Sequence, residues 1–277
     1  MHPWHQKNLL GSDAPFTLII TDDNEFPPHW HEATEIIYAL DDHLRIGVNQ
    51  DVYELNERDI AVINGGEVHY FLHHALKIRR AVLLFNPVTF DPFTVGLKDR
   101  SFSRILIRRG ERDLHPVLEA QIRTVIEEYE GKREGYAIAL KARLCDFIVS
   151  LIRGVPMEER SPGERTRRLN RLERLDQVFA YVAEHHTGRI TLGEIASVAH
   201  FSEYYFTRFF REATGMTFGR YLNNFRVQKA AEYLRDTADS ITNIAFNAGF
   251  GSVKSFNRVF KQIKGCAPSA YKKAISE

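Results

Sequence analysis

The chain has little cysteine and no long apolar run. Its two cysteines, Cys145 and Cys266, lie far apart and outside any CxxC pattern. This usage is typical of reduced thiols in the cytoplasm and excludes a disulfide framework. No run of about 18 apolar residues is present, so no membrane-spanning helix is expected. The first residues lack the basic segment and apolar core of a signal peptide. We therefore expect a cytoplasmic protein that does not contact a membrane.

The chain also has almost no net charge, but its charge is unevenly distributed. The 277 residues carry a formal net charge of +1. Residues 172–277 contain 14 Lys and Arg against 10 Asp and Glu, a net +4, whereas residues 1–171 contain 23 against 26, a net −3. A basic C-terminal part on a mildly acidic body is typical of a module that meets phosphate, although this signal alone is weak.

The first 90 residues or so alternate between short apolar runs and turn signals. Pro27-Pro28 and Asn64-Gly65-Gly66 are among the turns. Strands at such close spacing are typical of a β-barrel or a double-sheet jelly roll. The expected strands are Phe16–Ile20, Glu35–Leu40, Leu44–Asn49, Asp59–Ile63 and Ile78–Phe85.

The periodicity then changes to that of helices. Apolar residues recur three and four positions apart at about 116–129 and 136–152, with Gly131 and Gly135 between, which predicts an antiparallel helix pair. Its apolar stripe must pack either on a second copy of the chain, which we favour, or on the barrel. The fold class is α+β multidomain, with a β-barrel or jelly roll and a helical hairpin followed by an all-α domain. The predicted domains are the barrel (1–95), the helical hairpin as a candidate for dimerisation (96–153), a linker (154–171) and the all-α domain (172–277).

The all-α domain contains a sequence repeat. Ala245 follows Ala196 by 49 positions, whereas Phe256 follows Phe206 by 50, and one extra residue, Gly251, explains the step. The spacing predicts two helix–turn–helix units that place two reading helices on one DNA face. An all-helical bundle with outward charge is the alternative, and the repeat argues against it.

Each unit has the residues that a helix–turn–helix needs. Gly249 suits the tight turn of the second unit, and His200 suits that of the first less well. Ser202 and Ser252 stand where helix N-caps belong. Arginine and asparagine can contact bases bidentately, whereas lysine more often holds phosphate. The outward residues that we assign to DNA binding are Tyr204, Thr207, Arg208 and Arg211 in the first unit and Lys254, Ser255, Asn257, Arg258 and Lys261 in the second.

These residues carry a family resemblance. The segment from Arg226-Val227 through Ile244-Ala245 and Gly249-Phe250 to Gly265-Cys266-Ala267-Pro268 resembles the signature of AraC/XylS-type transcription regulators. The resemblance covers about 172–277 and implies reading helices at about 203–211 and 253–261. It further implies double-stranded DNA and RNA polymerase as partners, a homodimer, a small-molecule effector and no cofactor. A role with sugars is a family-level expectation.

The front half contains a cluster of possible ligands. His29 and His31 are followed by Glu35 and, later, by His69, a set that resembles the metal-binding motifs of cupins and implies a cupin-like barrel. The alternative, which we favour, is that these residues line an effector pocket without metal. Such a pocket would suit a polyol, since hydroxyls need several donors and acceptors beside an apolar face. Trp30 and Arg45 are further candidates for the lining of this pocket. The N-terminal arm with Trp4 is a candidate for its cover.

Two function classes follow from these patterns. The first is a ligand-responsive transcription regulator, whose effector must bind one arrangement of the DNA-binding domains more tightly than another. The second is a metal-dependent cupin enzyme, an isomerase or dioxygenase, with a helical appendage. The repeat favours the regulator over the enzyme. The effector, the operator, and the choice between activation and repression stay open.

Overall fold

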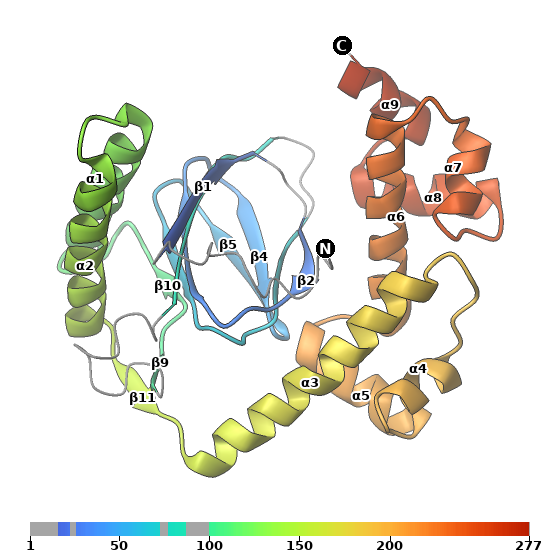
Figure 1. Ribbon diagram of the computed structural model, residues 1–277, viewed down its shortest axis with the longest axis horizontal. Coiled ribbons are helices and arrows are strands. Elements are labelled where there is room, and N and C mark those ends of the chain that lie inside the picture. The colour runs from blue at the N-terminus through green and yellow to red at the C-terminus, as the bar shows by residue number, and fades with distance from the viewer. Residues whose placement is uncertain (1–15, 23–25, 73–76, 87–99, 277) are drawn as a thin grey trace.

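A computed structural model describes residues 16–22, 26–72, 77–86 and 100–276. Its N-terminal part consists of antiparallel strands arranged as two facing sheets (Figure 1). The strands are β1 (Phe16–Thr21), β2 (Phe26–His29), β3 (Thr34–Ala39), β4 (Leu44–Val48), β5 (Asp51–Leu55), β6 (Ile60–Ile63), β7 (His69–Phe71), β8 (Arg80–Phe85), β9 (Arg100–Phe102), β10 (Leu106–Ile107) and β11 (Met157–Glu159). One sheet has the order β1-β8-β3-β6-β10 and the other β2-β7-β4-β5, while β11 pairs with β9.

Strand β3 shows why the barrel forms. All six of its residues are buried, because both faces of its sheet are covered. Ile37 and Ala39 pack between the two sheets, whereas Ile36 and Tyr38 point to the other side. Side chains alternate across a strand, so the apolar run from Ile36 to Ala39 supplies both faces. The predicted fold class of a β-rich sensor part and a helical C-terminal part is confirmed.

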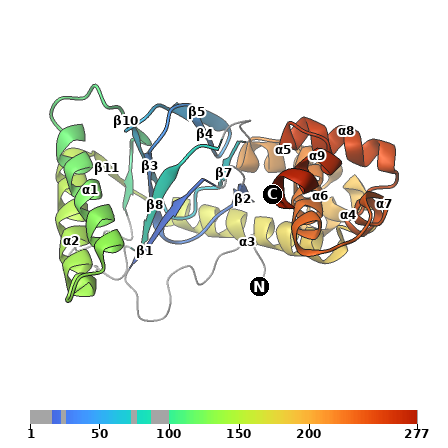
Figure 2. The same ribbon diagram turned by 90° about the horizontal axis from the view of Figure 1, so that it is seen from above.

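Two antiparallel helices cover the outer face of the five-stranded sheet. They are α1 (His115–Gly131) and α2 (Tyr136–Gly154), and both lie against the barrel in two orthogonal views (Figures 1 and 2). The stripe of α2, including Leu144 and Phe147, is buried in one core with Ile36 and Tyr38. Of the two uses left open for this stripe, the structure shows packing on the barrel. Dimerisation through the hairpin stays a prediction.

The next helix begins earlier than its apolar pattern suggested. Helix α3 spans Pro162–His185, so residues 162–171 of the segment predicted as a linker are helical. Ser161 and Glu164 form a reciprocal capping box, and Pro162 occupies the first turn, where its missing N–H is harmless. The first turns of α3 are charged and contain too few apolar residues to show a helical periodicity. For this reason we predicted the helix only from about residue 172.

The C-terminal helices form two cores joined by one long helix. The first core contains apolar residues of α3, α5 and α6, and it also includes Trp30, Val68 and Tyr70 of the barrel. The second core joins the C-terminal half of α6 to the helices that follow it. No helix among the described residues is long and apolar enough to span a bilayer. The helices are α4 (Leu192–Val198), α5 (Glu203–Thr214), α6 (Phe218–Asp236), α7 (Ile241–Asn247), α8 (Val253–Lys264) and α9 (Pro268–Ser276).

Candidate functional site

The two helix–turn–helix units have the same local geometry. In the first, the backbone N–H of Phe201 donates to the carbonyl of Ala196 at 2.9 Å, and in the second Phe250 donates to Ala245 at 3.0 Å. Both alanines are fully buried, so a small side chain is required where the second helix crosses the first. The repeat in the sequence is therefore a repeat in backbone hydrogen bonding.

Both turns use a left-handed residue. His200 has φ +57° and Gly249 has φ +91°. Histidine tolerates this region better than most side chains, so its presence at the first turn is permitted. The second turn also has no room for a side chain, because a Cβ on Gly249 would lie 2.0 Å from the carbonyl oxygen of His186.

The residues predicted to bind DNA lie on the outer faces of α5 and α8. Eight of the nine are exposed, and Ser255 is half-buried and donates its backbone N–H to the Ser252 hydroxyl at 3.2 Å. Tyr204 has 74% of its surface exposed, so its ring and hydroxyl are open to a partner molecule. Arg208 makes only a long, exposed ion pair with Glu212, at 3.7 Å. These side chains are therefore available to an incoming ligand.

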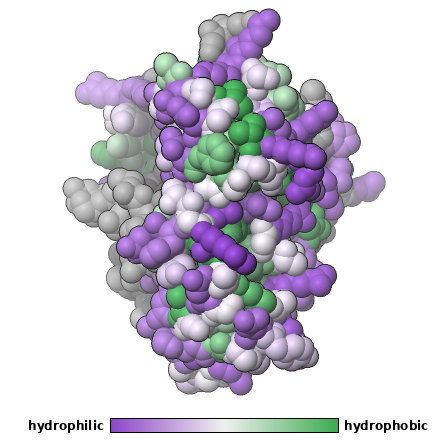
Figure 3. All heavy atoms as spheres, turned by 90° about the vertical axis from the view of Figure 1, so that its right-hand side faces the viewer, coloured by the Kyte–Doolittle hydropathy of each residue, from purple (hydrophilic) through white to green (hydrophobic). Residues whose placement is uncertain are grey.

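The two helices differ in charge. Helix α8 contains four cations, Lys254, Arg258, Lys261 and Lys264, and no acid, whereas the two arginines of α5 are balanced by two glutamates. Electrostatic attraction to phosphate therefore falls mainly on α8. The end of the molecule formed by the C-terminal helices has a largely hydrophilic surface (Figure 3).

The barrel brings four of the predicted sensor residues together. His29 and His69 are register partners on β2 and β7, and their rings lie 4.1 Å apart. His31 and Glu35 complete the cluster, and all four side chains are buried. One ligand atom from each residue lies within 4.8 Å of the others. A single ion could therefore contact all four.

Hydrogen bonds fix the orientation of this histidine cluster. Glu35 Oε2 lies 3.1 Å from His31 Nε2 and 3.3 Å from His69 Nε2. Burial raises the pKa of Glu35, but the charge of His69 and the hydrogen bonds from both rings outweigh it and hold the pKa well below its ordinary value. Burial lowers the pKa of His69, and the carboxylate of Glu35 reverses this effect, so the pKa lies above its ordinary value.

The other predicted sensor residues lie elsewhere. The indole of Trp30 points away from the histidine cluster, and its Nε1 donates to Asp176 of α3 at 2.8 Å. Arg45 lies on β4 at the edge of a separate cavity. Trp4 is outside the described residues. The predicted sensor residues therefore lie in three places. Trp30 is separated from His29 and His31 because adjacent strand residues point to opposite sides.

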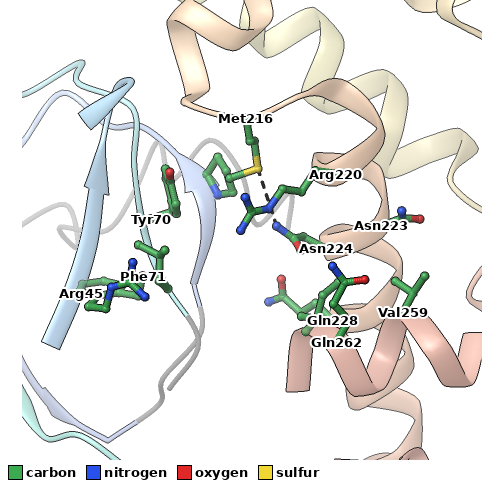
Figure 4. Close-up of a pocket in the computed structure, with 13 residues that line it drawn as sticks. Arg45, Tyr70, Phe71, Met216, Arg220, Asn223, Asn224, Gln228, Val259 and Gln262 are labelled. Atoms are coloured by element: carbon green, nitrogen blue, oxygen red, sulfur yellow. Dashed lines mark hydrogen bonds between the residues drawn. The ribbon is translucent and has the colours of Figure 1, made fainter. Parts of the chain in front are cut away.

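The cavity beside Arg45 lies between the barrel and the DNA-binding domain. Its volume is about 580 Å³, and polar side chains of α6 and α8 face Tyr70 and Phe71 across it (Figure 4). Asn224 donates to the sulfur of Met216 at 3.7 Å on the wall formed by α6. The main polar lining residues are Arg45, Arg220, Asn223, Asn224, Gln228 and Gln262.

A second cavity lies where α3 meets the barrel. Its volume is about 250 Å³, and Trp30 forms part of its wall. The lining is strongly basic, with Arg100, Arg160, Arg165 and Arg168 against one acid, Glu32. This cavity is chemically suited to an anion, whereas the larger one offers mostly uncharged amides.

Comparison with known proteins identifies both halves. A model of AraC-like ligand binding domains matches residues 16–148, and a model of helix-turn-helix domains matches residues 195–274. The chain belongs to the AraC/XylS family of transcription regulators. As an AraC-family member with both modules, it is a ligand-responsive DNA-binding regulator, and the alternative of a cupin enzyme is excluded.

Several relatives align with most of this AraC-family chain. The HTH-type transcriptional activator RhaS of Klebsiella pneumoniae is 26% identical over 247 residues, which cover 86% of this chain and 84% of the relative. The HTH-type transcriptional activator RhaR of Mannheimia succiniciproducens is 21% identical over 272 residues, covering 97% and 95%. Among solved structures, ToxT from Vibrio cholerae is 16% identical, covers 95% of this chain and 98% of its own, and has a TM-score of 0.49.

Sequence reasoning missed the amide-rich wall of the larger cavity in this AraC-family protein. Asn223, Asn224 and Gln228 lie on α6, where polar residues are ordinarily assigned to solvent. A signal was present, because these amides interrupt a helix whose other polar residues are mostly charged. The barrel surface opposite these amides is brought there by tertiary packing. The local sequence pattern of α6 does not indicate it.

Proposed function

We propose that this AraC-family regulator controls genes of carbohydrate uptake or metabolism and that its effector is a sugar-sized polar molecule. The observation that carries the proposal is the cavity of about 580 Å³ between the barrel and the DNA-binding domain. Its volume is in the range of small-molecule sites. Amide and guanidinium groups offer donors and acceptors to hydroxyls, while Tyr70 and Phe71 offer an aromatic face.

The position of this cavity explains how an effector would alter DNA binding. One wall comes from the barrel and the other from α6 and α8, the second reading helix. A molecule that contacts both walls binds one relative placement of the two domains better than another. Only such a difference in affinity shifts an equilibrium between conformations. The effector thereby biases the presentation of α8 to DNA.

We propose that α5 and α8 enter successive major grooves on one face of the DNA. Helix α6, which joins the two units, has 19 residues and is therefore about 28 Å long at about 1.5 Å per residue. This length approaches the rise of one DNA turn, about 34 Å. In this arrangement Arg208, Asn257 and Arg258 reach base edges, whereas Arg211 and Lys261 hold phosphate.

The base-reading assignment gives a first prediction. Arg208→Ala is expected to weaken binding to a selected DNA duplex by about 1–3 kcal/mol, or about 5- to 150-fold, and to relax the base preference at one position. Arg211→Ala should instead weaken binding to all sequences and reduce the salt dependence by about one ion. Fluorescence anisotropy at several salt concentrations measures both.

The matched control for these variants is Arg153→Ala. Arg153 is exposed in the last turn of α2. Helix α2 lies on the far side of the barrel from α8 (Figure 1). The Arg153→Ala substitution removes one positive charge at a position outside the proposed DNA interface. An Arg208→Ala protein with unchanged affinity and unchanged base preference would remove Arg208 from the reading set.

The effector proposal gives a second prediction. Among pentoses, hexoses, short oligosaccharides and their phosphates, one sugar is expected to give a saturable rise in melting temperature. Arg220→Gln should weaken that binding by about 10-fold or more, because a hydrogen bond to a charged group is worth about 1.5–3 kcal/mol. Thermal shift and calorimetry on metal-stripped and metal-loaded protein measure the effect.

The two cavities provide their own control. Arg168→Gln removes a cation from the smaller, basic cavity and leaves the larger one intact. A sugar that binds between the domains should be insensitive to Arg168→Gln. Binding that is lost in Arg168→Gln and kept in Arg220→Gln would move the effector to the basic cavity and favour a sugar phosphate. No stabilisation by any sugar would contradict the carbohydrate assignment.

The remaining partners are proposed on the same basis. A homodimer would form through the outer face of α2, where Ile138, Cys145 and Val149 lie on one exposed side, and Ile138 has 76% of its surface exposed. We place the protein in the cytoplasm, where it meets DNA and RNA polymerase. Sedimentation equilibrium at micromolar concentration distinguishes dimer from monomer.

A further inference from the structure

We propose that His29, His31, Glu35 and His69 form a site for one divalent first-row transition metal and that its occupancy regulates DNA binding. Three imidazoles and one carboxylate converge inside the barrel, all buried and with their ligand atoms within 4.8 Å of one another. Imidazole with carboxylate is a donor set that zinc, cobalt, iron, nickel and manganese accept. The inference rests on the DNA-binding function of the family and is independent of the sugar proposal.

The hydrogen bonds around two of the rings are those that usually support a metal-binding histidine. His31 Nδ1 lies 2.9 Å from the carbonyl oxygen of Ala33, and His69 Nδ1 lies 2.8 Å from that of Glu67. The Nε2 atoms of both rings face Glu35 Oε2. Each of these rings therefore has its Nδ1 held by a backbone carbonyl oxygen, which leaves its Nε2 beside the Glu35 carboxyl group.

A bound metal fits this geometry, since the rings of His31 and His69 lie with their centroids 4.9 Å apart in a buried site. Each ring then keeps its Nδ1–H, which donates to the backbone carbonyl, and turns the Nε2 lone pair toward the ion. Such a second hydrogen bond is the usual support of a metal-binding histidine.

The same strands connect this site to the DNA-binding domain. Trp30 stands between His29 and His31, and its indole points out of the barrel to Asp176 of α3. Val68 and Tyr70 flank His69 and belong to the core that contains α3, α5 and α6. Metal ligands and domain-contact residues therefore alternate along the same stretches of backbone.

This alternation supplies a physical route for regulation. Binding of His29, His31 and His69 to one ion fixes the backbone on both sides of Trp30. It also fixes the backbone of His69 itself, between Val68 and Tyr70. The contact of Trp30 and Tyr70 with the first helix–turn–helix core is fixed with it. The metal-loaded protein should hold its DNA-binding domain in one placement, whereas the metal-stripped protein should sample others.

Metal binding is tested first on the full-length protein after chelation. Co²⁺ is the probe, because its visible absorption reports coordination by nitrogen and oxygen ligands. We expect one Co²⁺ per chain, displaced by Zn²⁺. The double variant His31→Gln/His69→Gln should lose more than about 100-fold in affinity, beyond the 10- to 100-fold typical of outer-shell changes. His43→Gln is the matched control, since His43 is exposed and pairs with Glu54 away from the cluster.

The outcomes of this titration are distinct. Should the double variant fail to fold, the wild-type titration still decides. A chain that binds no Co²⁺ or Zn²⁺ at micromolar concentration overturns the site. Binding that survives in the double variant and falls in His43→Gln also overturns it. Neither result bears on the sugar screen, which is read in metal-stripped protein as well.

Regulation is tested by the affinity for a DNA duplex selected by the protein. Metal loading is expected to change this affinity by at least about 5-fold, the lower end of ordinary allosteric coupling. Trp30→Phe should still bind one metal ion per chain but lose most of the metal-dependent change in DNA affinity. Phenylalanine keeps an aromatic ring at this position but has no N–H to donate to Asp176. A metal-bound protein whose DNA affinity is identical to that of the stripped protein would overturn the regulatory half of the proposal.

Discussion

Glu119→Gln is expected to lower the free energy of unfolding by about 2–3 kcal/mol, because the Glu119 carboxylate is the anion of a cluster that helps to join α1 to the barrel. Glu119 is almost fully buried and accepts two hydrogen bonds from the Arg58 guanidinium, one of them at 2.6 Å. Tyr38 donates to it at 2.8 Å and Arg123 at 3.2 Å. Removing the charge leaves these donors without their anion. The loss is kept below that of a fully buried pair because both arginines reach solvent.

The same carboxylate gives a pH dependence of known sign. The hydrogen bonds from Arg58 outweigh the effect of burial and lower the pKa of Glu119 to about 2. A carboxyl group whose pKa is lower in the folded state than in the unfolded state stabilises the fold at pH values above its unfolded-state pKa. For glutamate that pKa is ordinarily about 4.3. That contribution is lost as the pH falls from about 5 towards 2. The difference in unfolding free energy between wild type and Glu119→Gln should therefore shrink across this window.

Urea unfolding between pH 7 and pH 3 measures this difference. Glu130→Gln is the control, because Glu130 is exposed on the same helix and lies outside the Arg58 cluster. Other carboxyls also titrate in this range, so the comparison between variants isolates Glu119. A Glu119→Gln protein that is as stable as wild type at pH 7 would show that the Glu119 carboxylate does not contribute to holding α1 on the barrel.

Gly249→Ala is expected to destabilise the second helix–turn–helix unit by about 3 kcal/mol or more and to abolish specific DNA binding. The left-handed conformation at φ +91° by itself costs a non-glycine residue about 1–3 kcal/mol. The new Cβ would also lie 2.0 Å from the carbonyl oxygen of His186. That carbonyl accepts a hydrogen bond from Arg226 Nε at 2.8 Å, so it cannot move without breaking the tie between α3 and α6.

The neighbouring Gly251 provides the control. It lies two residues further on in the same turn, where a Cβ would meet nothing within 4 Å. Gly251→Ala should therefore leave thermal unfolding and DNA affinity close to wild type. Equal behaviour of the two variants in differential scanning calorimetry and anisotropy would contradict the steric account of the turn.

The reading helices could be predicted because their determinants are local. A buried alanine, a turn residue and a serine N-cap recur at nearly constant spacing, and each acts on its own backbone neighbourhood. The helix–turn–helix domain model covers both units, in agreement with that pattern. The start of α3 was missed for the opposite reason, since Ser161 and Glu164 stabilise its first turn without any apolar period.

The sensor site was predictable only in part. The spacing of His29 and His31 put both rings on one side of a strand, and β2–β7 pairing then placed His69 opposite. Trp30 and Arg45 were assigned to the same pocket but lie in other surroundings. Their positions depend on which surface of the barrel meets α3 and α6, and no local pattern encodes that contact.

The sequence by itself determined the two helix–turn–helix units, the β-rich sensor part and the histidines inside it, because these follow from short-range spacing of apolar, turn and capping residues. Only the tertiary structure decided that the stripe of α2 packs on the chain's own sheet and that a polar cavity opens between the barrel and α6. It also decided that Trp30 links the histidine cluster to α3. The physical reason is that the local sequence shows only that a face is apolar or polar. Which surface packs against that face depends on residues that are distant in the chain.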